Sequence, residues 1–199
     1  MTGFDLIVRL FGLLLGFSIA EVLGGFARTV RLKLGLTPVQ PDTTRVGWLI
    51  PLLGLLVIMD QMSFWLAFYV LQAHIPLSFL SMLAVLFLIG GFYVVSGLVF
   101  PAHPERWQDF DAYYFRVKRV VLGGLLAVNV ALLIFGSVVV VEGAELARTG
   151  VDSGIGAAAS VAFLPLLGLL LATRRSGASL VLLLACNAAL LLEALSHSR

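Results

Sequence analysis

The chain has 199 residues, of which 60% are hydrophobic and 12% are charged, and its formal net charge is +2 at pH 7. In soluble domains about a quarter of the residues are charged. The core of a soluble domain could not absorb this much apolar surface, so the composition excludes an ordinary soluble protein.

Six apolar runs follow one another along the chain, each close to the roughly 20 residues of helix that cross a bilayer core. The runs are continuously apolar and rich in leucine, whereas barrel strands are short and alternate apolar with polar residues. The sequence therefore predicts an all-α integral membrane protein, a six-transmembrane-helix bundle that forms a single domain over residues 1–199. The predicted spans are 4–26, 47–71, 77–100, 119–141, 154–173 and 178–195.

Lys and Arg residues are concentrated in three of the predicted connectors. Ten of the thirteen lie there: Arg28, Arg31, Lys33, Arg45, Arg106, Arg116, Lys118, Arg119, Arg174 and Arg175. Because short loops rich in Lys and Arg stay in the cytoplasm, we expect loops 28–46, 101–118 and 174–177 to be cytoplasmic. Both termini are then outside, in a cell (plasma or inner) membrane. The alternative is a secretory signal peptide cleaved before Glu21, which would leave five spans.

The connector 101–118 reads "PAHPERWQDFDAYYFRVK" and mixes charged with aromatic residues. This mixture is typical of a helix that lies in the membrane interface. We predict a short interfacial helix before the fourth span, with Arg116, Lys118 and Arg119 at anionic lipid headgroups. A docking surface for protein or nucleic acid would need more than this segment offers, so no nucleic-acid partner is expected.

Gly12 and Gly16 form a GxxxG pattern in the first span, and paired glycines recur in later spans. Such residues let helix backbones approach closely. Packing within one bundle is the commoner cause of the pattern. Contact with a second copy of the chain or with another membrane protein remains open.

Asp60 and Gln61 lie at the middle of the second span, where a carboxylate is least expected. An ionised carboxylate at the bilayer centre costs about 2.5–3.5 kcal/mol even on the lenient insertion scale. Asp60 is therefore expected to face the bundle interior and to be protonated, paired or solvated, with Gln61 turned onto a neighbouring helix. Asn129 and Asn187 lie near the centres of the fourth and sixth spans, where an amide most often makes a hydrogen bond between helices.

Three further charged residues lie within the spans. Glu21 is two helical turns from Arg28 on nearly the same face, so the arginine can partly compensate its charge. Arg9 is one turn from Asp5 and can pair with it. Glu193, close to the outer end of the sixth span, can reach water or Arg9.

Catalytic and cofactor motifs are missing from the sequence. It contains no HExxH, CxxC, GxSxG, Walker or GxGxxG pattern, and its three histidines lie at span ends. Cys186 is the single cysteine, so it can form neither an intrachain disulfide nor a metal site by itself. We expect no enzyme activity, no metal and no cofactor.

Two interpretations of the polar residues remain. In the first, the protein is a channel or transporter with a polar path for protons, ions or a small solute through Asp60, Gln61, Glu21, Arg9, Asn129, Asn187 and Glu193. In the second, it is a non-catalytic membrane subunit or scaffold whose buried polar residues fix helix packing. A water-lined groove that reaches Asp60 would favour the first, and a dry bundle with mutually satisfied polar groups the second.

Overall fold

The structure, a computed structural model, describes residues 3–36, 45–71, 78–104, 107–142 and 154–196. They form six helices: α1 (Gly3–Lys33), α2 (Leu49–Leu71), α3 (Phe79–Val99), α4 (Phe110–Glu142), α5 (Gly154–Ala172) and α6 (Ser176–Ser196). The described residues contain no strand beyond one isolated bridge, so the all-α prediction is confirmed. The predicted connectors fall partly on 37–44, 72–77, 105–106 and 143–153, which lie outside the described residues.

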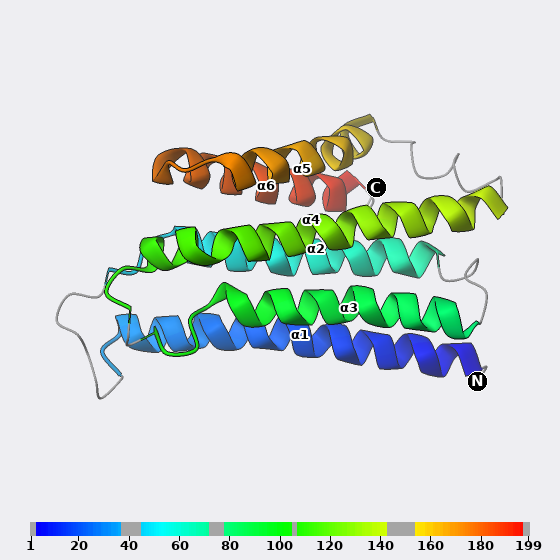
Figure 1. The fold of residues 1–199 in the computed structure, drawn as a ribbon, viewed down its shortest axis with the longest axis horizontal. Coiled ribbons are helices and arrows are strands. Elements are labelled where there is room, and N and C mark those ends of the chain that lie inside the picture. Colours follow the sequence, from blue (N-terminus) through cyan, green and yellow to red (C-terminus); the bar gives the residue numbers. More distant parts are fainter. Residues whose placement is uncertain (1–2, 37–44, 72–77, 105–106, 143–153, 197–199) are drawn as a thin grey trace.

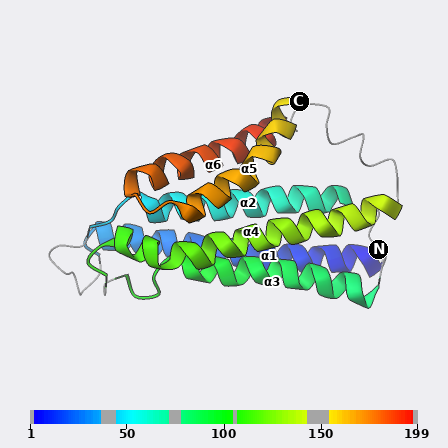
Figure 2. The same cartoon turned by 45° about the horizontal axis from the view of Figure 1, so that its top comes forward.

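The helices are arranged as three pairs laid one on another (Figure 1). Helices α1 and α3 form one outer layer, α2 and α4 the middle layer, and α5 and α6 the other outer layer. Figure 2 shows that α5 and α6 are inclined relative to the other four. Helix α2 packs against α1, α3, α4 and α6, which makes it the central helix of the bundle.

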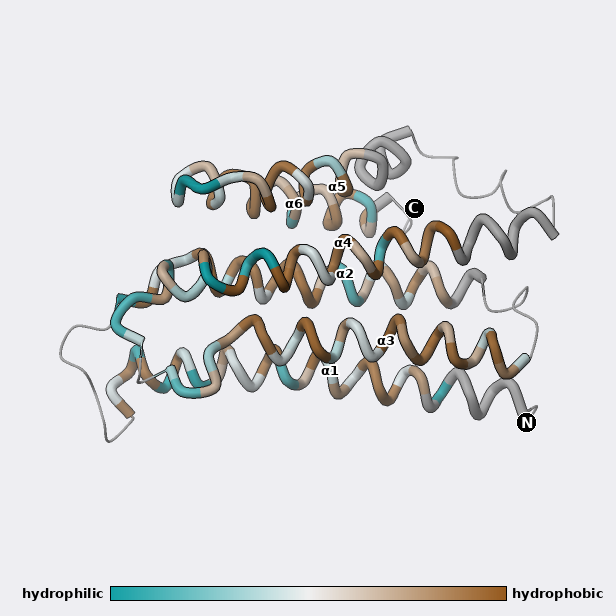
Figure 3. The backbone as a smooth tube through the Cα atoms, viewed as in Figure 1, coloured by the Kyte–Doolittle hydropathy of each residue, from teal (hydrophilic) through white to brown (hydrophobic). Residues whose placement is uncertain are grey.

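Among the residues whose side chains the structure describes, five helices are long and apolar enough to cross a membrane, and Ala162–Ala172 of α5 forms a shorter apolar helix. Large apolar side chains are exposed on every helix, from Phe17 on α1 to Leu191 on α6. Soluble monomers rarely expose apolar surface on this scale. The polar segments gather at one end of the bundle, where α1 ends and α4 begins (Figure 3). Outer surface and core are both apolar, as expected for a membrane protein.

Helix α1 extends further than its predicted span and continues to Lys33, into the predicted loop 28–46. Its end is a Schellman motif, in which Leu36 N donates to Arg31 O at 3.0 Å and Gly35 N to Leu32 O at 3.1 Å. Gly35 has a φ of 68°, a left-handed conformation that glycine adopts without strain. The helix therefore stops at this glycine and not at the first basic residue.

A separate interfacial helix over 101–118 is not confirmed. Residues 101–104 and 107–109 are not part of an α-helix, and the rest of the segment is the beginning of α4. The backbone of this connector is bonded to the connector after α1: Arg45 N donates to Gln108 O at 2.8 Å, and Phe110 N donates to Arg45 O at 3.1 Å. The helical part of the segment, residues 110–118, is continuous with the predicted fourth span.

Glycines permit the closest helix contacts. A Cβ added to Gly25 of α1 would lie 2.3 Å from the Phe100 ring, and one added to Gly54 of α2 would lie 2.9 Å from the same ring. Phe100, at the end of α3, is thus packed into a space that two glycines leave open. Gly12 of the GxxxG pattern likewise packs on Trp65 of α2, whereas a Cβ on Gly16 would meet nothing within 4 Å.

Candidate functional site: the buried polar contacts of α2

Asp60 lies at the middle of α2 and is 2% exposed, as predicted for a residue that faces the bundle interior. Both of its carboxylate oxygens accept hydrogen bonds from Asn129 Nδ2 of α4, Oδ1 at 3.1 Å and Oδ2 at 2.9 Å. The same amide nitrogen donates to Leu125 O, one turn earlier in α4, at 2.9 Å. The amide carries two hydrogens, so one serves the backbone of α4 and the other is shared between the two carboxylate oxygens.

Gln61 contacts the outer layer formed by α1 and α3, on the side of α2 that faces away from α6. Its Nε2 donates to Ser96 Oγ of α3 at 2.9 Å, and Ser96 Oγ lies 2.8 Å from Ser18 Oγ of α1. All three residues are buried. The expectation that Gln61 turns onto a neighbouring helix is confirmed, and its partner is itself hydrogen-bonded to a third helix.

Asn187 connects α6 to the same central helix. Its Nδ2 donates to Leu52 O of α2 at 3.3 Å and to Leu183 O of its own helix at 2.8 Å. Two more α6 residues, Cys186 and Glu193, are close enough to Asp60 to interact with it electrostatically.

Three of the four helices that pack on α2 are therefore joined to it through a side-chain hydrogen bond inside the bundle, and the fourth, α1, is joined to α3. Asp60 binds α4, Gln61 binds α3 and through it α1, and the Leu52 carbonyl binds α6. Interhelical hydrogen bonds of this kind contribute about 0.6 kcal/mol on average in a membrane protein. Their main effect is geometric, because each one fixes the height of one helix against another.

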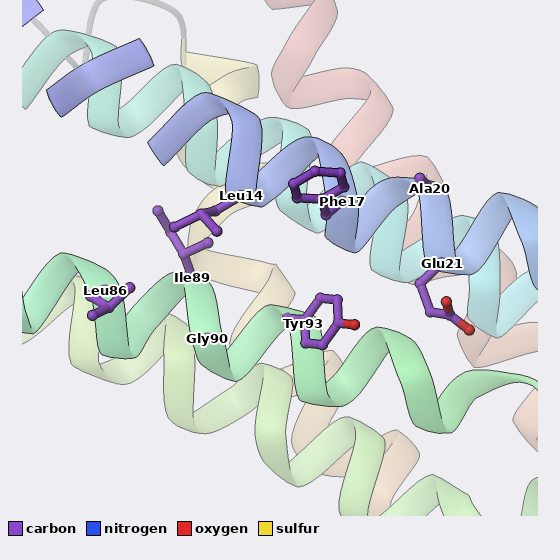
Figure 4. Close-up of a pocket in the computed structure, with 8 residues that line it drawn as sticks. All are labelled: Leu14, Phe17, Ala20, Glu21, Leu86, Ile89, Gly90 and Tyr93. Atoms are coloured by element: carbon purple, nitrogen blue, oxygen red, sulfur yellow. The ribbon is translucent and has the colours of Figure 1, made fainter. Parts of the chain in front are cut away.

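Glu21 lies away from these contacts, on the outer side of α1 (Figure 4). Arg28 Nη2 donates to Glu21 Oε1 at 3.2 Å, and each side chain is 40% exposed. The predicted compensation of Glu21 by Arg28 is thus present. Arg9 is exposed on α1, and no described contact joins it to Asp60. The Asp5 side chain lies outside the described part of the chain.

Of the three residues expected at lipid headgroups, Lys118 is buried inside the bundle. It is 3% exposed, and its Nζ donates to the carbonyl oxygens of Leu170, at 3.3 Å, and Thr173. These carbonyls end α5, where cations are favoured. Lys118 thus caps α5 inside the bundle, which corrects the expectation. Arg116 and Arg119 are exposed, and the Arg116 guanidinium lies 5.5 Å from the centre of the Trp107 ring.

The described residues contain no group of three or more His, Cys, Asp or Glu side chains that could hold a metal ion. His74 and His197 lie outside the described ranges, and His103 lies in the connector before α4. The buried polar atoms of α2 are amide, hydroxyl and carboxylate groups whose contacts link helices, an arrangement suited to packing or to passing protons and ions.

Sequence reasoning missed Ser18 and Ser96. Serine is frequent in membrane helices, because its hydroxyl can bond to its own helix backbone. The available signal was that both serines are polar residues within predicted spans, as is Gln61, a side chain that needs several partners. These residues can be identified as partners only when the axial positions of α1, α2 and α3 relative to one another are known.

Replacing Ser96 by alanine is expected to lower the free energy of unfolding by about 1–3 kcal/mol, because it leaves the buried Gln61 amide without its acceptor. The measurement is unfolding in mixed micelles. The matched control is Ser81→Ala, at the exposed beginning of the same helix, which should change stability by less than about 0.5 kcal/mol. Equal effects at the two positions would contradict the assigned role of Ser96.

Comparison of the chain with protein-family models, with curated proteins and with solved structures gives no match.

Proposed function

We propose that the chain spans a cell (plasma or inner) membrane six times, with the basic end of the bundle in the cytoplasm and both termini outside. Helix α5 has 19 residues and so is about 28 Å long, close to the roughly 30 Å of a bilayer core. At the basic end, Lys33 Nζ lies 5.9 Å from the centre of the exposed Trp48 ring. Trp and basic residues together are typical of the cytoplasmic interface, where Arg116 and Arg119 can contact anionic headgroups.

Cysteine labelling tests this orientation. Cys186 is buried and gives little background. A cysteine at Leu36 or Gly177, both exposed at the basic end, is expected to resist a membrane-impermeant maleimide in intact cells. A cysteine at Ser78, exposed at the other end, should react. Reaction at all three positions, or at Leu36 alone, would contradict the proposed topology.

Within this architecture, the protein is proposed to act as a non-catalytic membrane subunit or scaffold. The observation that carries the proposal is that α3, α4 and α6 are each joined to α2 by a side-chain hydrogen bond inside the bundle, and that α1 is joined to α3 in the same way. Asp60 accepts from Asn129 inside the bundle, and it is not among the residues that line the groove between α1 and α3. Polar residues used in this way give a fixed helix arrangement, as a subunit that presents its outer surface to partners requires.

A polar path for protons or ions is the second candidate. The observation in its favour is that α2 and α6, two apolar helices packed on each other, each carry an acidic side chain, Asp60 and Glu193, which is more than helix packing needs. Acidic residues within membrane spans often belong to ion pathways and proton relays. The two proposals differ in whether water or ions reach Asp60.

Flux measurements separate these proposals. Purified protein in liposomes is expected to show no proton or cation flux above empty liposomes, and Asp60→Asn, which keeps the shape and removes the charge, is expected to behave like the parent. Its folding is checked by its unfolding transition. A flux in the parent that Asp60→Asn abolishes without unfolding the protein would overturn the scaffold proposal in favour of transport.

A further inference from the structure

A groove of about 480 Å³ runs along the outer surface of the bundle between α1 and α3. Most of its length is apolar, with Phe17 and Leu86 among its exposed side chains. Figure 4 shows its lining residues: Leu14, Phe17, Ala20, Glu21, Leu86, Ile89, Gly90 and Tyr93. Its volume falls within the roughly 300–1,000 Å³ of small-molecule sites. Ala20 and Gly90 have little or no side chain, which leaves room for an occupant.

The polar groups of the groove are Glu21 and Tyr93. Figure 4 shows the Tyr93 hydroxyl on the side of its ring that faces Glu21. Arg28 binds Glu21 through Oε1. Among the described residues, neither Glu21 Oε2 nor the Tyr93 hydroxyl has a hydrogen-bond partner. A mainly apolar groove with a few convergent polar groups is the usual form of a ligand site.

The depth of these groups limits what can bind them. Ser18 of α1 lies level with Ser96 and with Gln61 near the middle of α2, and Glu21 is less than one helical turn from Ser18. In a bilayer, Glu21 and Tyr93 thus face hydrocarbon and not water, and an unmet polar atom there costs several kcal/mol. A second full charge at this depth is also costly, so a neutral partner is favoured.

A hydroxyl group satisfies both polar residues. It can donate to the Glu21 carboxylate, which only accepts, and can accept from the Tyr93 phenol. We propose that the α1/α3 groove is a lateral binding site for a neutral, hydroxyl-bearing lipid, with its hydroxyl at Glu21 and Tyr93 and its apolar chain along Leu14, Leu86 and Ile89. The site goes beyond the proposed scaffold function, since it lies on the outer layer and uses none of the α2 contacts.

The occupant to which these observations point is a quinol, because its hydroxyl is carried on an apolar ring that can enter the hydrocarbon. A diacylglycerol would bury its ester groups at this depth, where the groove offers them no further polar side chain, and unpaired polar groups are costly there. Binding of a diacylglycerol is therefore an outcome that the experiment must exclude.

Native mass spectrometry of the full chain in detergent measures binding directly. The probes are oleyl alcohol, its methyl ether, dioleoylglycerol and decylubiquinol. Gly90→Leu fills the groove, and a Cβ at Gly90 meets nothing within 4 Å, so the variant should fold. Gly97→Leu is the matched control, because Gly97 is equally open on the same helix but does not line the groove.

Oleyl alcohol is expected to bind the parent and Gly97→Leu equally, and Gly90→Leu at least about tenfold more weakly, because the leucine occupies the space of the chain. Tyr93→Phe and Glu21→Gln should each weaken binding by about two- to tenfold, the value of one hydrogen bond. The methyl ether should bind more weakly than the alcohol. Decylubiquinol is expected to respond to both polar variants, and a response of dioleoylglycerol in its place would overturn the assignment to a quinol.

Three outcomes would overturn the proposal. Unchanged binding by Gly90→Leu would place the ligand elsewhere. Equal binding of the alcohol and its ether would reduce the groove to a non-specific seat for acyl chains. A change of oligomeric state in Gly90→Leu, with no effect of any variant on probe binding, would assign the groove to a second copy of the chain.

Discussion

Replacing Gly25 by alanine is expected to lower the free energy of unfolding by about 1–3 kcal/mol, the usual cost of overpacking a core. The added Cβ would lie 2.3 Å from Cδ2 and 2.4 Å from Cγ of the Phe100 ring. Phe100 cannot move aside easily, because it is 3% exposed and its ring centre lies 4.9 Å from that of Phe26. Relief of the clash would therefore require α1 and α3 to separate. Unfolding in mixed micelles, followed by circular dichroism, measures the effect.

The neighbouring glycine provides the control. A Cβ at Gly24 would come no closer than 3.6 Å, to Arg28 Nη1. Gly24→Ala is therefore expected to leave stability unchanged or to raise it by up to about 1 kcal/mol, because alanine favours helix over glycine. Similar losses for Gly24→Ala and Gly25→Ala would show that the two helices are not packed through Gly25.

The second large effect is expected at the pair formed by Asp60 and Asn129. Asn129→Leu removes the donor to both carboxylate oxygens and leaves a buried acid without a hydrogen bond, which should cost about 1–3 kcal/mol or more. Replacing both partners by apolar residues can be nearly neutral. The double variant Asp60→Leu/Asn129→Leu is therefore expected to be more stable than Asn129→Leu alone.

A double-mutant cycle in the same unfolding assay gives the coupling energy of the pair. Asn187→Leu serves as the comparison, since Asn187 donates to backbone carbonyls and not to Asp60. Its combination with Asp60→Leu should be close to additive. A double variant at residues 60 and 129 that is less stable than either single variant would contradict the assigned pairing.

The helices could largely be predicted from the sequence, because each apolar run exceeds what a soluble core uses. Helix ends were harder, since they depend on local backbone chemistry. Hydropathy ended the first span at residue 26, whereas α1 runs to the Schellman turn at Gly35. Hydropathy also began the fourth span at residue 119, whereas α4 begins at Phe110, directly after Asp109, whose Oδ1 accepts from Asp111 N at 2.9 Å.

The polar site could be predicted in part. Asp60, Gln61, Asn129 and Asn187 were selected because polar groups in a span must turn inward, and each makes a contact between helices. The pairing of these residues could not be predicted, because the sequence of one helix does not give its axial position relative to neighbouring helices. The missing information on helix positions also explains Lys118. Its place near the end of a basic connector predicts contact with lipid headgroups. Its role as a cap of α5 depends on where α5 packs, which the sequence does not show.

The reactivity of native Cys186 tests most directly whether the centre of the bundle is a dry, packed polar contact. Cys186 is 0% exposed and lies one residue before Asn187, which donates to Leu52 O of α2. A small, permanently charged methanethiosulfonate reagent requires water to reach a thiol. In the folded protein in nanodiscs, where the reagent reaches both membrane faces, Cys186 should stay unmodified while a cysteine at the exposed Leu36 reacts completely. Cys186 should react after unfolding. Modification of Cys186 in the folded protein at a rate similar to that at Leu36 would show that water reaches the centre of the bundle, and would contradict the account.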